Sequence, residues 1–190
     1  EAKQTLVDLC SRLIEDEGAT DASRQAAIEA LSQVATPASI QTVAGLLDDD
    51  VLSHAALMFL AQHADAATFM QLTKTTWSQL DEQGRLNVIQ AMAARGPAFA
   101  GALTNLAKQG PTAQRIVAIQ ALGHCATKAQ LGDLLGLADA PGVSAARDAA
   151  LIDLAGRLAP ADATPVYQSF LNDRSTLQIR QAALIGCVRL

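Results

Sequence analysis

The three histidines are the side chains best suited to metal binding or acid–base chemistry, and their spacing favours neither. His54 and His63 are nine residues apart, which is half a turn out of phase on an α-helix, so their side chains would point in opposite directions. His124 is followed directly by Cys125, and neighbouring side chains on a helix diverge by about 100°. We therefore expect each histidine to be an exposed or peripheral side chain and not a metal ligand or a catalytic base.

Cysteines and acidic runs are the next candidates for chemistry. Cys10, Cys125 and Cys187 form no Cys-x-x-Cys pair and have apolar neighbours, so we expect small buried thiols instead of a zinc site or a disulfide framework. The acidic runs at 15–17 and 48–50 lack the alternating oxygen ligands and the glycine of a calcium loop. Motifs for nucleotides, phosphates and hydrolase nucleophiles are also missing from the sequence. The sequence therefore predicts no enzyme, no metal and no cofactor.

Composition and charge narrow the class of partner. The chain has 190 residues, a net charge of −5 and only 14 Lys and Arg, which are scattered along it. A nucleic-acid-binding surface needs clustered basic residues, so we expect no nucleic-acid partner. The longest apolar run, 55–61, is far below the ~20 residues that span a bilayer, so we expect no membrane partner. Alanine accounts for 39 residues, a proportion that suits close helix–helix packing and disfavours strands.

A unit of about 31 residues repeats along the chain. In each copy an anchor residue is followed by Ala or Val three positions later, by a large aliphatic residue four later and by an apolar residue seven later; in the fourth copy these are Ala118, Ile119 and Leu122. Offsets of three, four and seven lie on one face of an α-helix, so six helices with the same buried stripe are predicted. The anchors are Arg24, Ser53, Arg85, Arg115, Arg147 and Arg180.

Shorter segments with apolar periodicity lie between the anchor helices and predict their partners. Thr36 followed by Pro37 is a typical helix start, and Thr127 to Gln130 and Ser175 to Gln178 match the capping box. Because no segment alternates with period two for long, the chain is predicted to be all-α, with twelve helices in six antiparallel pairs and a single domain over 1–190. The predicted first helices span 2–14, 37–47, 66–80, 97–108, 128–137 and 162–171. Their aromatic residues, which we expect to pack between repeats, are Phe69, Phe99, Tyr167 and Phe170.

This two-helix unit, with Arg-x-x-Ala-[Ile/Leu]-x-x-Leu in its second helix, resembles a HEAT repeat, in particular the short bacterial variety that includes the HEAT-like repeats of phycobilin lyases. The segments 24–31 and 115–123 are the best copies, and the resemblance covers essentially the whole chain. It implies a right-handed α-solenoid of about six repeats. It also implies a ladder along the stack between turn aspartates and structural arginines, with gaps at Ser53 and before Arg115. The ladder candidates are Arg24, Arg85, Arg115, Arg147 and Arg180 with Asp21, Asp50, Asp81, Asp139 and Asp173.

The second helices of such a solenoid would line its concave face. The columns one and five residues after each anchor should point there, and they form a neutral, mixed surface that suits a protein segment. We therefore predict a non-catalytic protein–protein interaction scaffold. The resemblance also raises two alternatives, a phycobilin-lyase-type enzyme or accessory protein and a nucleic-acid binder of the DNA-alkylation-repeat type; few basic residues and a single Trp disfavour the second. The predicted binding residues are Leu86, Gln90, Ile116, Gln120 and Ile152.

The last predicted helix differs from the first in its polar face. Apolar residues spread around much of the circumference of the segment 177–190, whereas the first helix has a substantial polar side. Repeat proteins usually close their ends with polar outer faces. We therefore expect the chain to be a fragment of a longer array or larger protein, with self-association through the C-terminal repeat as a further expectation.

Overall fold

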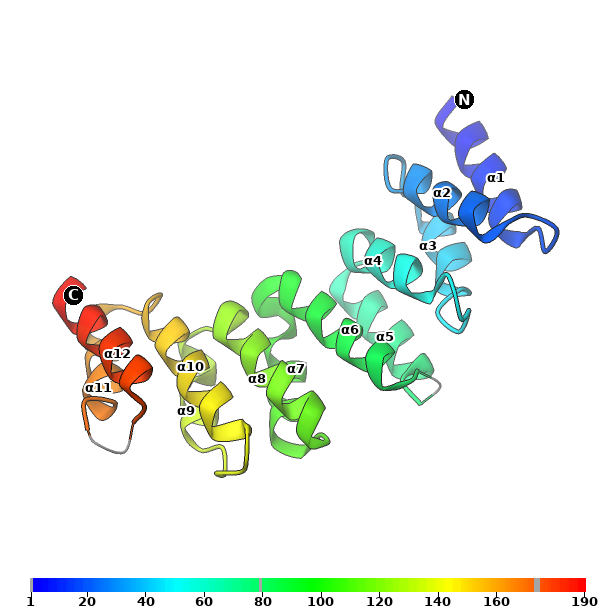
Figure 1. The fold of residues 1–190 in the computed structure, drawn as a ribbon. Helices are drawn as coiled ribbons and strands as arrows, with labels where there is room; N and C mark the ends of the chain where they lie inside the picture. Colours follow the sequence, from blue (N-terminus) through cyan, green and yellow to red (C-terminus); the bar gives the residue numbers. More distant parts are fainter. Residues whose placement is uncertain (1, 79, 173–174) are drawn as a thin grey trace. The chain divides into compact units, whose positions relative to one another are not determined.

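The computed structural model describes residues 2–78, 80–172 and 175–190, and over these ranges the chain is all-α, as predicted (Figure 1). It forms twelve α-helices and two short 3-10 helices there, without a strand. None of the helices in these ranges is long and apolar enough to span a membrane. The contacts divide the chain into two compact units, Glu1–Ala91 and Met92–Leu190.

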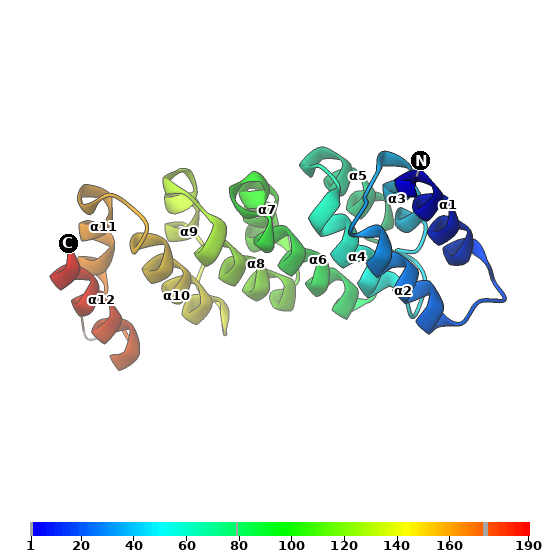
Figure 2. The same ribbon diagram turned by 90° about the horizontal axis from the view of Figure 1, so that it is seen from above.

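The first unit is built from helix pairs stacked in two layers. In the first two pairs, α1 packs against α2 and α3 against α4, while α1 also contacts α3 and α2 contacts α4 (Figure 2). The first helices of successive pairs therefore lie in one layer and the second helices in the other. The helices that belong to this unit are α1 (Ala2–Glu15), α2 (Asp21–Leu31), α3 (Pro37–Ala44), α4 (Ser53–His63), α5 (Ala66–Thr76) and most of α6 (Glu82–Ala94).

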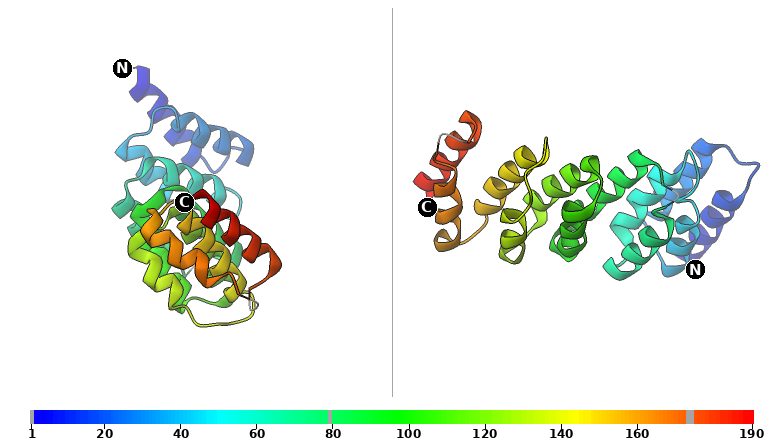
Figure 3. Two further views of the ribbon diagram at one scale, coloured as in Figure 1. Left: turned by 90° about the vertical axis from the view of Figure 1, so that its left-hand side faces the viewer. Right: turned by 90° about the horizontal axis from the view of Figure 1, so that it is seen from below.

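The second unit repeats this arrangement. The second helices α8, α10 and α12 lie side by side, with α10 between the other two, and each packs against a first helix of its own pair (Figure 3). The elements of this unit that follow α6 are η1 (Gly96–Phe99), α7 (Ala100–Gln109), α8 (Thr112–Cys125), η2 (Lys128–Gln130), α9 (Leu131–Leu135), α10 (Val143–Ala155), α11 (Pro160–Ser169) and α12 (Leu177–Arg189).

The predicted apolar stripe is confirmed in five of the six anchor helices. In α2, α4, α6, α8 and α10 the residues three, four and seven positions after the anchor are all buried. The prediction is wrong in α12, where Leu184 is 56% exposed and Cys187 only half-buried. The reason is packing: α10 lies between two other second helices, whereas α12 contacts α10 and α11 on one side.

The apolar residues predicted to spread around α12 are largely exposed, and the charged residues of α1 are exposed as expected, although three leucines of α1 are exposed with them. Leu6, Leu9 and Leu13 of α1 are exposed beside its charged residues. Each of them lies one position before a buried residue of the same helix, because the buried positions are Val7, Cys10 and Ile14. The exposed apolar residues of α12 and the residue after it are Leu177, Leu184, Ile185, Val188 and Leu190.

Several first helices are shorter than predicted. The third helix ends at Ala44 with Gly45 as its C-cap, three residues before the predicted end. The predicted segments 97–108 and 128–137 each open with a 3-10 turn before the α-helix, which is a common way for a helix to begin. α11 begins earlier than predicted, at Pro160, because proline is favoured in the first turn of a helix.

Two of the three predicted helix starts are confirmed. Thr36 caps α3 and accepts a hydrogen bond from Ser39 N, whose hydroxyl in turn accepts from Thr36 N. Thr127 and Gln130 form the predicted capping box at η2. The third prediction is off by one residue, since Thr176 and not Ser175 caps α12. The four aromatic residues expected to pack, Phe69, Phe99, Tyr167 and Phe170, are buried.

Candidate binding surface

The anchor arginines hydrogen-bond the ends of the preceding first helices. The Nε atoms of Arg24, Arg85 and Arg115 donate to a backbone carbonyl in the last turn of the preceding helix or directly after it, each at 3.0 Å. Arg147 Nη1 does the same to the carbonyl oxygen of Leu137 at 3.1 Å. Carbonyl groups at a helix C-terminus have no intrahelical donor, and a cation there interacts favourably with the helix dipole. For these four arginines the contacts agree with the predicted structural role.

One ion pair links successive repeats in the first unit. Arg24 Nη1 lies 3.3 Å from Asp49 Oδ2 and 3.8 Å from Asp21 Oδ1. The ladder acid is thus Asp49, one residue before the predicted Asp50. Asp49 Oδ1 also accepts hydrogen bonds from the backbone of Val51 and Leu52, and the bond from Leu52 is the main reason why the pKa of Asp49 is lowered.

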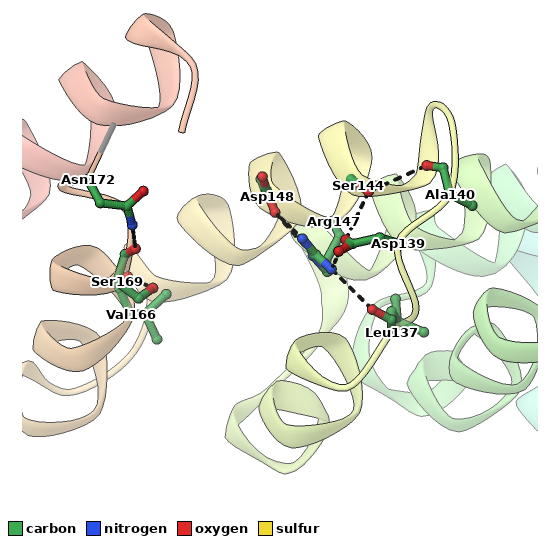
Figure 4. A network of polar contacts seen from close by, with 9 residues as sticks. All are labelled: Leu137, Asp139, Ala140, Ser144, Arg147, Asp148, Val166, Ser169 and Asn172. Carbon is green, nitrogen blue, oxygen red and sulfur yellow. Dashed lines mark hydrogen bonds and ion pairs between the residues drawn. The ribbon is translucent and has the colours of Figure 1, made fainter. Parts of the chain in front are cut away.

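The fifth anchor, Arg147, is held within its own repeat (Figure 4). Its guanidinium pairs with Asp139 at 2.7 Å and with Asp148 at 3.0 Å. Ser144 donates to Asp139 as well, and this bond, followed by the Arg147 contact, lowers the pKa of Asp139. Asp148 belongs to one of the columns predicted to face a partner, but its carboxylate is occupied by Arg147. The other polar contacts in the figure involve Ser169 and Asn172 and lie at the end of α11.

The remaining members of the ladder do not pair as the resemblance implies. Asp81 Oδ1 accepts from Gly84 N at 2.6 Å and so caps the start of α6, while Arg85 donates to the carbonyls of Trp77 and Ser78. Arg115 forms no ion pair with any described residue, as expected from a turn without an acid. Asp173 lies outside the described residues.

The histidines are dispersed. His54 is exposed with Nδ1 3.2 Å from Asn87 Nδ2, and His124 is exposed with Nδ1 4.0 Å from Asp153 Oδ2. His63 departs from the prediction because it is half-buried, with its ring 4.8 Å from that of Phe59 and its Nε2 atom buried. No group of three His, Cys, Asp or Glu residues in the described ranges is arranged to hold a metal ion.

The three cysteines are free thiols, two of them buried as predicted. Cys10 and Cys125 are buried, and burial raises the pKa of both thiols. Cys187 is half-buried. A raised pKa keeps a thiol protonated and therefore poorly nucleophilic at neutral pH.

The five predicted binding residues fall into both units and differ in exposure. Gln90 and Gln120 are exposed, whereas Leu86, Ile116 and Ile152 are half-buried. Leu86 and Gln90 belong to the first unit, and the other three to the second. Ile116 has a packing role: its Cδ1 atom would be 2.9 Å from a Cβ at Gly142, the residue with φ +78° before α10. Ile116 therefore fills the space that this glycine leaves.

Ile152 lies at a hollow between α10 and α12, and this hollow is the main candidate for a binding site. Its volume is about 530 Å³, and its lining includes Ile152 and Ile185, both from the column five residues after the anchors. Beside the hollow, α11 and α12 approach closely, because a Cβ at Gly186 of α12 would overlap the ring of Tyr167 of α11. Burial, and then the neighbouring Cys187, raises the pKa of Tyr167, while Arg189 acts in the opposite direction. The charged residues that line the hollow are all exposed, and they are Asp153, Arg157 and Arg189.

A second hollow of about 520 Å³ in the same unit shares Arg157 with the first. It is formed where the chain leaves α6, α8 and α10 and turns towards the next first helix. Apolar side chains such as Leu154 and Leu158 lie beside three basic ones, His124, Lys128 and Arg157.

The basic side chains of these two hollows were missed in the sequence, although a signal was present. The segment 92–190 contains nine Lys and Arg against six Asp and no Glu, whereas 1–91 contains five Lys and Arg against thirteen acidic residues. The net charge of −5 therefore conceals a basic second half. Basic residues also recur at the ends of successive second helices, at His63, Arg95, His124, Arg157 and Arg189.

No protein-family model matches the chain, and no curated protein is significantly similar to it.

Proposed function

We propose that this chain is a right-handed, HEAT-like α-solenoid that acts as a non-catalytic scaffold for protein–protein interaction. The recurring anchor, the buried stripe of five second helices and the inter-repeat pair Arg24–Asp49 support the repeat architecture. In such an array each repeat contacts its neighbours, and the second helices together offer an extended surface.

The hollow between α10 and α12 is the observation that carries the binding proposal. Its volume of about 530 Å³ falls within the range of roughly 300–1,000 Å³ that small-molecule sites occupy, so it has room for one or two partner side chains. Ile152 and Ile185 supply apolar surface, and exposed charged residues surround it. An apolar centre with a polar periphery is the usual anatomy of a protein–protein interface.

The lining of this hollow suits recognition better than catalysis. Its titratable groups are Asp153, Arg157, Tyr167 and Arg189, which include no pair of nucleophile and general base. The pKa of Tyr167 is raised, so its phenol stays protonated near neutral pH and serves as a hydrogen-bonding group. We therefore propose that the partner is a protein or peptide segment that inserts an apolar side chain against Ile152 and Ile185.

The test is selection of binders from a displayed peptide library, followed by affinity measurement with two matched variants. Ile185 and Leu184 are adjacent on α12 and similarly exposed, at 51% and 56%, but only Ile185 lines the hollow. Ile185→Asn should weaken the selected peptides about tenfold or more, since buried apolar anchors dominate binding energy. Leu184→Asn should leave the affinity within roughly twofold.

Two results would contradict the proposed function. One is the failure of the library to yield any peptide that binds the wild-type chain. The other is equal loss of affinity in the Ile185 and Leu184 variants, because the hollow would then contribute nothing specific.

A further inference from the structure

The second hollow, beside α8 and α10, combines positive charge with apolar surface. Lys128 lies at its edge with its Nζ atom 2.8 Å from Asp162 Oδ1, and its side chain is 69% exposed. His124 is also exposed, and its Nδ1 atom is 4.0 Å from Asp153 Oδ2. Each of these two basic groups therefore has one aspartate neighbour and a large part of its surface open to solvent.

Arg157 is the central basic group because it lines both hollows. Its Nη2 atom donates to the carbonyl oxygen of Ala126 at 3.2 Å and its Nη1 atom to that of Asp153 at 3.4 Å. These bonds fix the guanidinium between the end of α8 and the end of α10. Within the described ranges no carboxylate forms an ion pair with Arg157, so its positive charge is uncompensated.

We infer that these two hollows bind an acidic protein segment, in which a carboxylate pairs with Arg157 and an adjacent apolar side chain enters a hollow. The inference rests on the proposed function and adds the charge of the partner to it. Arginine is well suited to this role because its planar guanidinium keeps several donors that match a carboxylate. Lys128 provides a second cationic contact, and Ile152, Leu154 and Leu158 provide the apolar surface.

Charge and composition favour a protein segment over a nucleic acid. A phosphate backbone is bound by several clustered cations, whereas two of the three basic groups in the second hollow already have an aspartate neighbour. Binding of single strands relies on exposed aromatic side chains that stack with bases, and the second hollow has none in its lining. A single carboxylate beside an apolar side chain needs one guanidinium that no described carboxylate pairs with and a nearby apolar surface. Arg157 provides the first, and Leu154 and Leu158 provide the second.

The experiment measures fluorescence anisotropy of three labelled peptides of equal length, which mix leucine with glutamate, glutamine or lysine. A labelled single-stranded oligonucleotide is the fourth probe. We expect the glutamate–leucine peptide to bind the wild-type chain most tightly. Arg157→Gln should weaken it roughly tenfold and Lys128→Gln several-fold, since each variant removes a charge-assisted contact.

Matched controls separate a binding role from a structural one. Lys108 is an exposed lysine of the same unit whose Nζ is 2.6 Å from Asp133, so Lys108→Gln removes the same charge outside both hollows. It should change the affinity by no more than roughly twofold. Lys128→Gln leaves the Arg157–Ala126 hydrogen bond intact, and Arg157→Lys keeps the positive charge at position 157. Urea melts of these two variants, of Arg157→Gln and of Lys108→Gln show whether folding is retained.

Several outcomes would overturn the inference. They are tighter binding of the lysine–leucine peptide or of the oligonucleotide, equal effects of Lys108→Gln and Arg157→Gln, and absence of binding by the glutamate–leucine peptide. Concentration-dependent self-association that Arg157→Gln abolishes would identify a second copy as the occupant instead. If library-selected peptides depend on Ile185 but not on Arg157, the proposed function stands and this inference alone fails.

Discussion

Arg24, Arg85, Arg115 and Arg147 each donate to a carbonyl group at or just after the end of the preceding first helix, where no intrahelical donor is available. Three of them place Nε at the same distance, 3.0 Å, from such a carbonyl. Where the anchor is Ser53, the turn before α4 is held differently, by Asp49 accepting from Val51 and Leu52. A contact to backbone, unlike one to a side chain, needs no partner residue of a particular type. This explains why the arginine–carbonyl contact recurs from repeat to repeat while the arginine–aspartate pairing differs.

Arg115 offers the simplest test of this role because it donates to the Ala107 carbonyl and forms no ion pair with a described residue. Arg115→Met keeps much of the apolar stem but removes the donor. We expect a loss of about 1–3 kcal/mol in the free energy of unfolding, the usual effect of removing one partner of a charged hydrogen bond. Urea melts measure it, with Gln120→Ala as the control. A loss equal to that of the control would show that the bond does not stabilise the repeat.

Asp49 should make stability depend on acid pH. Its pKa in the folded state is lowered, chiefly by the Leu52 bond, from an unfolded value near the ordinary ~3.9. The carboxylate therefore stabilises the fold above about pH 4, and this contribution disappears as pH falls through the lower folded pKa. Asp49→Asn should cost about 1 kcal/mol at neutral pH and less at low pH. Urea melts between about pH 7 and pH 2 measure the difference, and a constant difference would contradict the assignment.

At the scale of elements, the positions buried in five anchor helices follow from period alone. The apolar residues three, four and seven positions after an anchor all lie on one face of the helix. The buried face of α2, α4, α6, α8 and α10 could therefore be predicted from sequence. Leu184 fits the same pattern, yet it is exposed, because burial depends on what packs against a face and not on the residues of that face. The ends of α3 and of the 128–137 segment were mispredicted because the apolar residues that follow these helices, Leu46, Leu47 and Leu137, are buried without being helical.

The candidate site was harder to predict than the helices. Counting five residues from the anchors identified Ile152 and Ile185, but the other predicted column, one residue after the anchors, selected Ile116, which packs at Gly142. Arg157 lies in a loop outside the predicted columns. Its importance depends on the bond to Ala126, which is distant in sequence and comes close only when repeats stack.

The middle of the second unit should carry much of its stability. Ile119 is fully buried in α8, and the neighbouring Gln120 is exposed, as predicted. Ile119→Ala should lower the free energy of unfolding by about 2–5 kcal/mol, because it removes buried methyl groups and leaves a cavity. Gln120→Ala should change it by less than about 0.5 kcal/mol. Urea melts of both variants decide the matter, and comparable losses would mean that the helix face is assigned wrongly.

The contact between α11 and α12 depends on a glycine. A methyl group at Gly186 would overlap the ring of Tyr167, which is itself buried. Gly186→Ala should therefore destabilise the fold by about 1–3 kcal/mol, even though alanine is the better helix former. Gly101→Ala in α7, where nothing lies within 4 Å, should be neutral or stabilising by up to about 1 kcal/mol. Thermal melts measure both, and a stable Gly186 variant would show that α12 is free to shift away.

At the scale of the whole molecule, charge is unevenly distributed along the chain. Residues 1–91 carry a formal net charge of −8 and residues 92–190 of +3, both counted with neutral histidine. The repeat fold itself does not require this difference in charge, because the same apolar positions are buried in both halves apart from α12. The difference therefore lies outside the buried stripe, and the two hollows that we propose to bind an acidic segment lie in the half with the positive charge.

The same asymmetry predicts different responses to salt in the two units. A net charge of −8 on a unit of this size is self-repelling, and exposed charges are screened as the Debye length falls from ~30 Å at 0.01 M to ~8 Å at 0.15 M salt. Salt should therefore increase amide-exchange protection in α2 and α4 by more than in α8 and α10. The second unit has a small net charge to screen, and salt also weakens ion pairs there such as Arg147–Asp139. Hydrogen–deuterium exchange with mass spectrometry at both salt concentrations resolves the four helices in one sample.

The control is a variant in which glutamine replaces Glu15, Asp16 and Glu17. This change reduces the charge of the first unit without altering the buried stripe, so it should reduce the salt response of that unit. Equal responses of both units, or a response unchanged by that replacement, would show that self-repulsion is not what salt relieves.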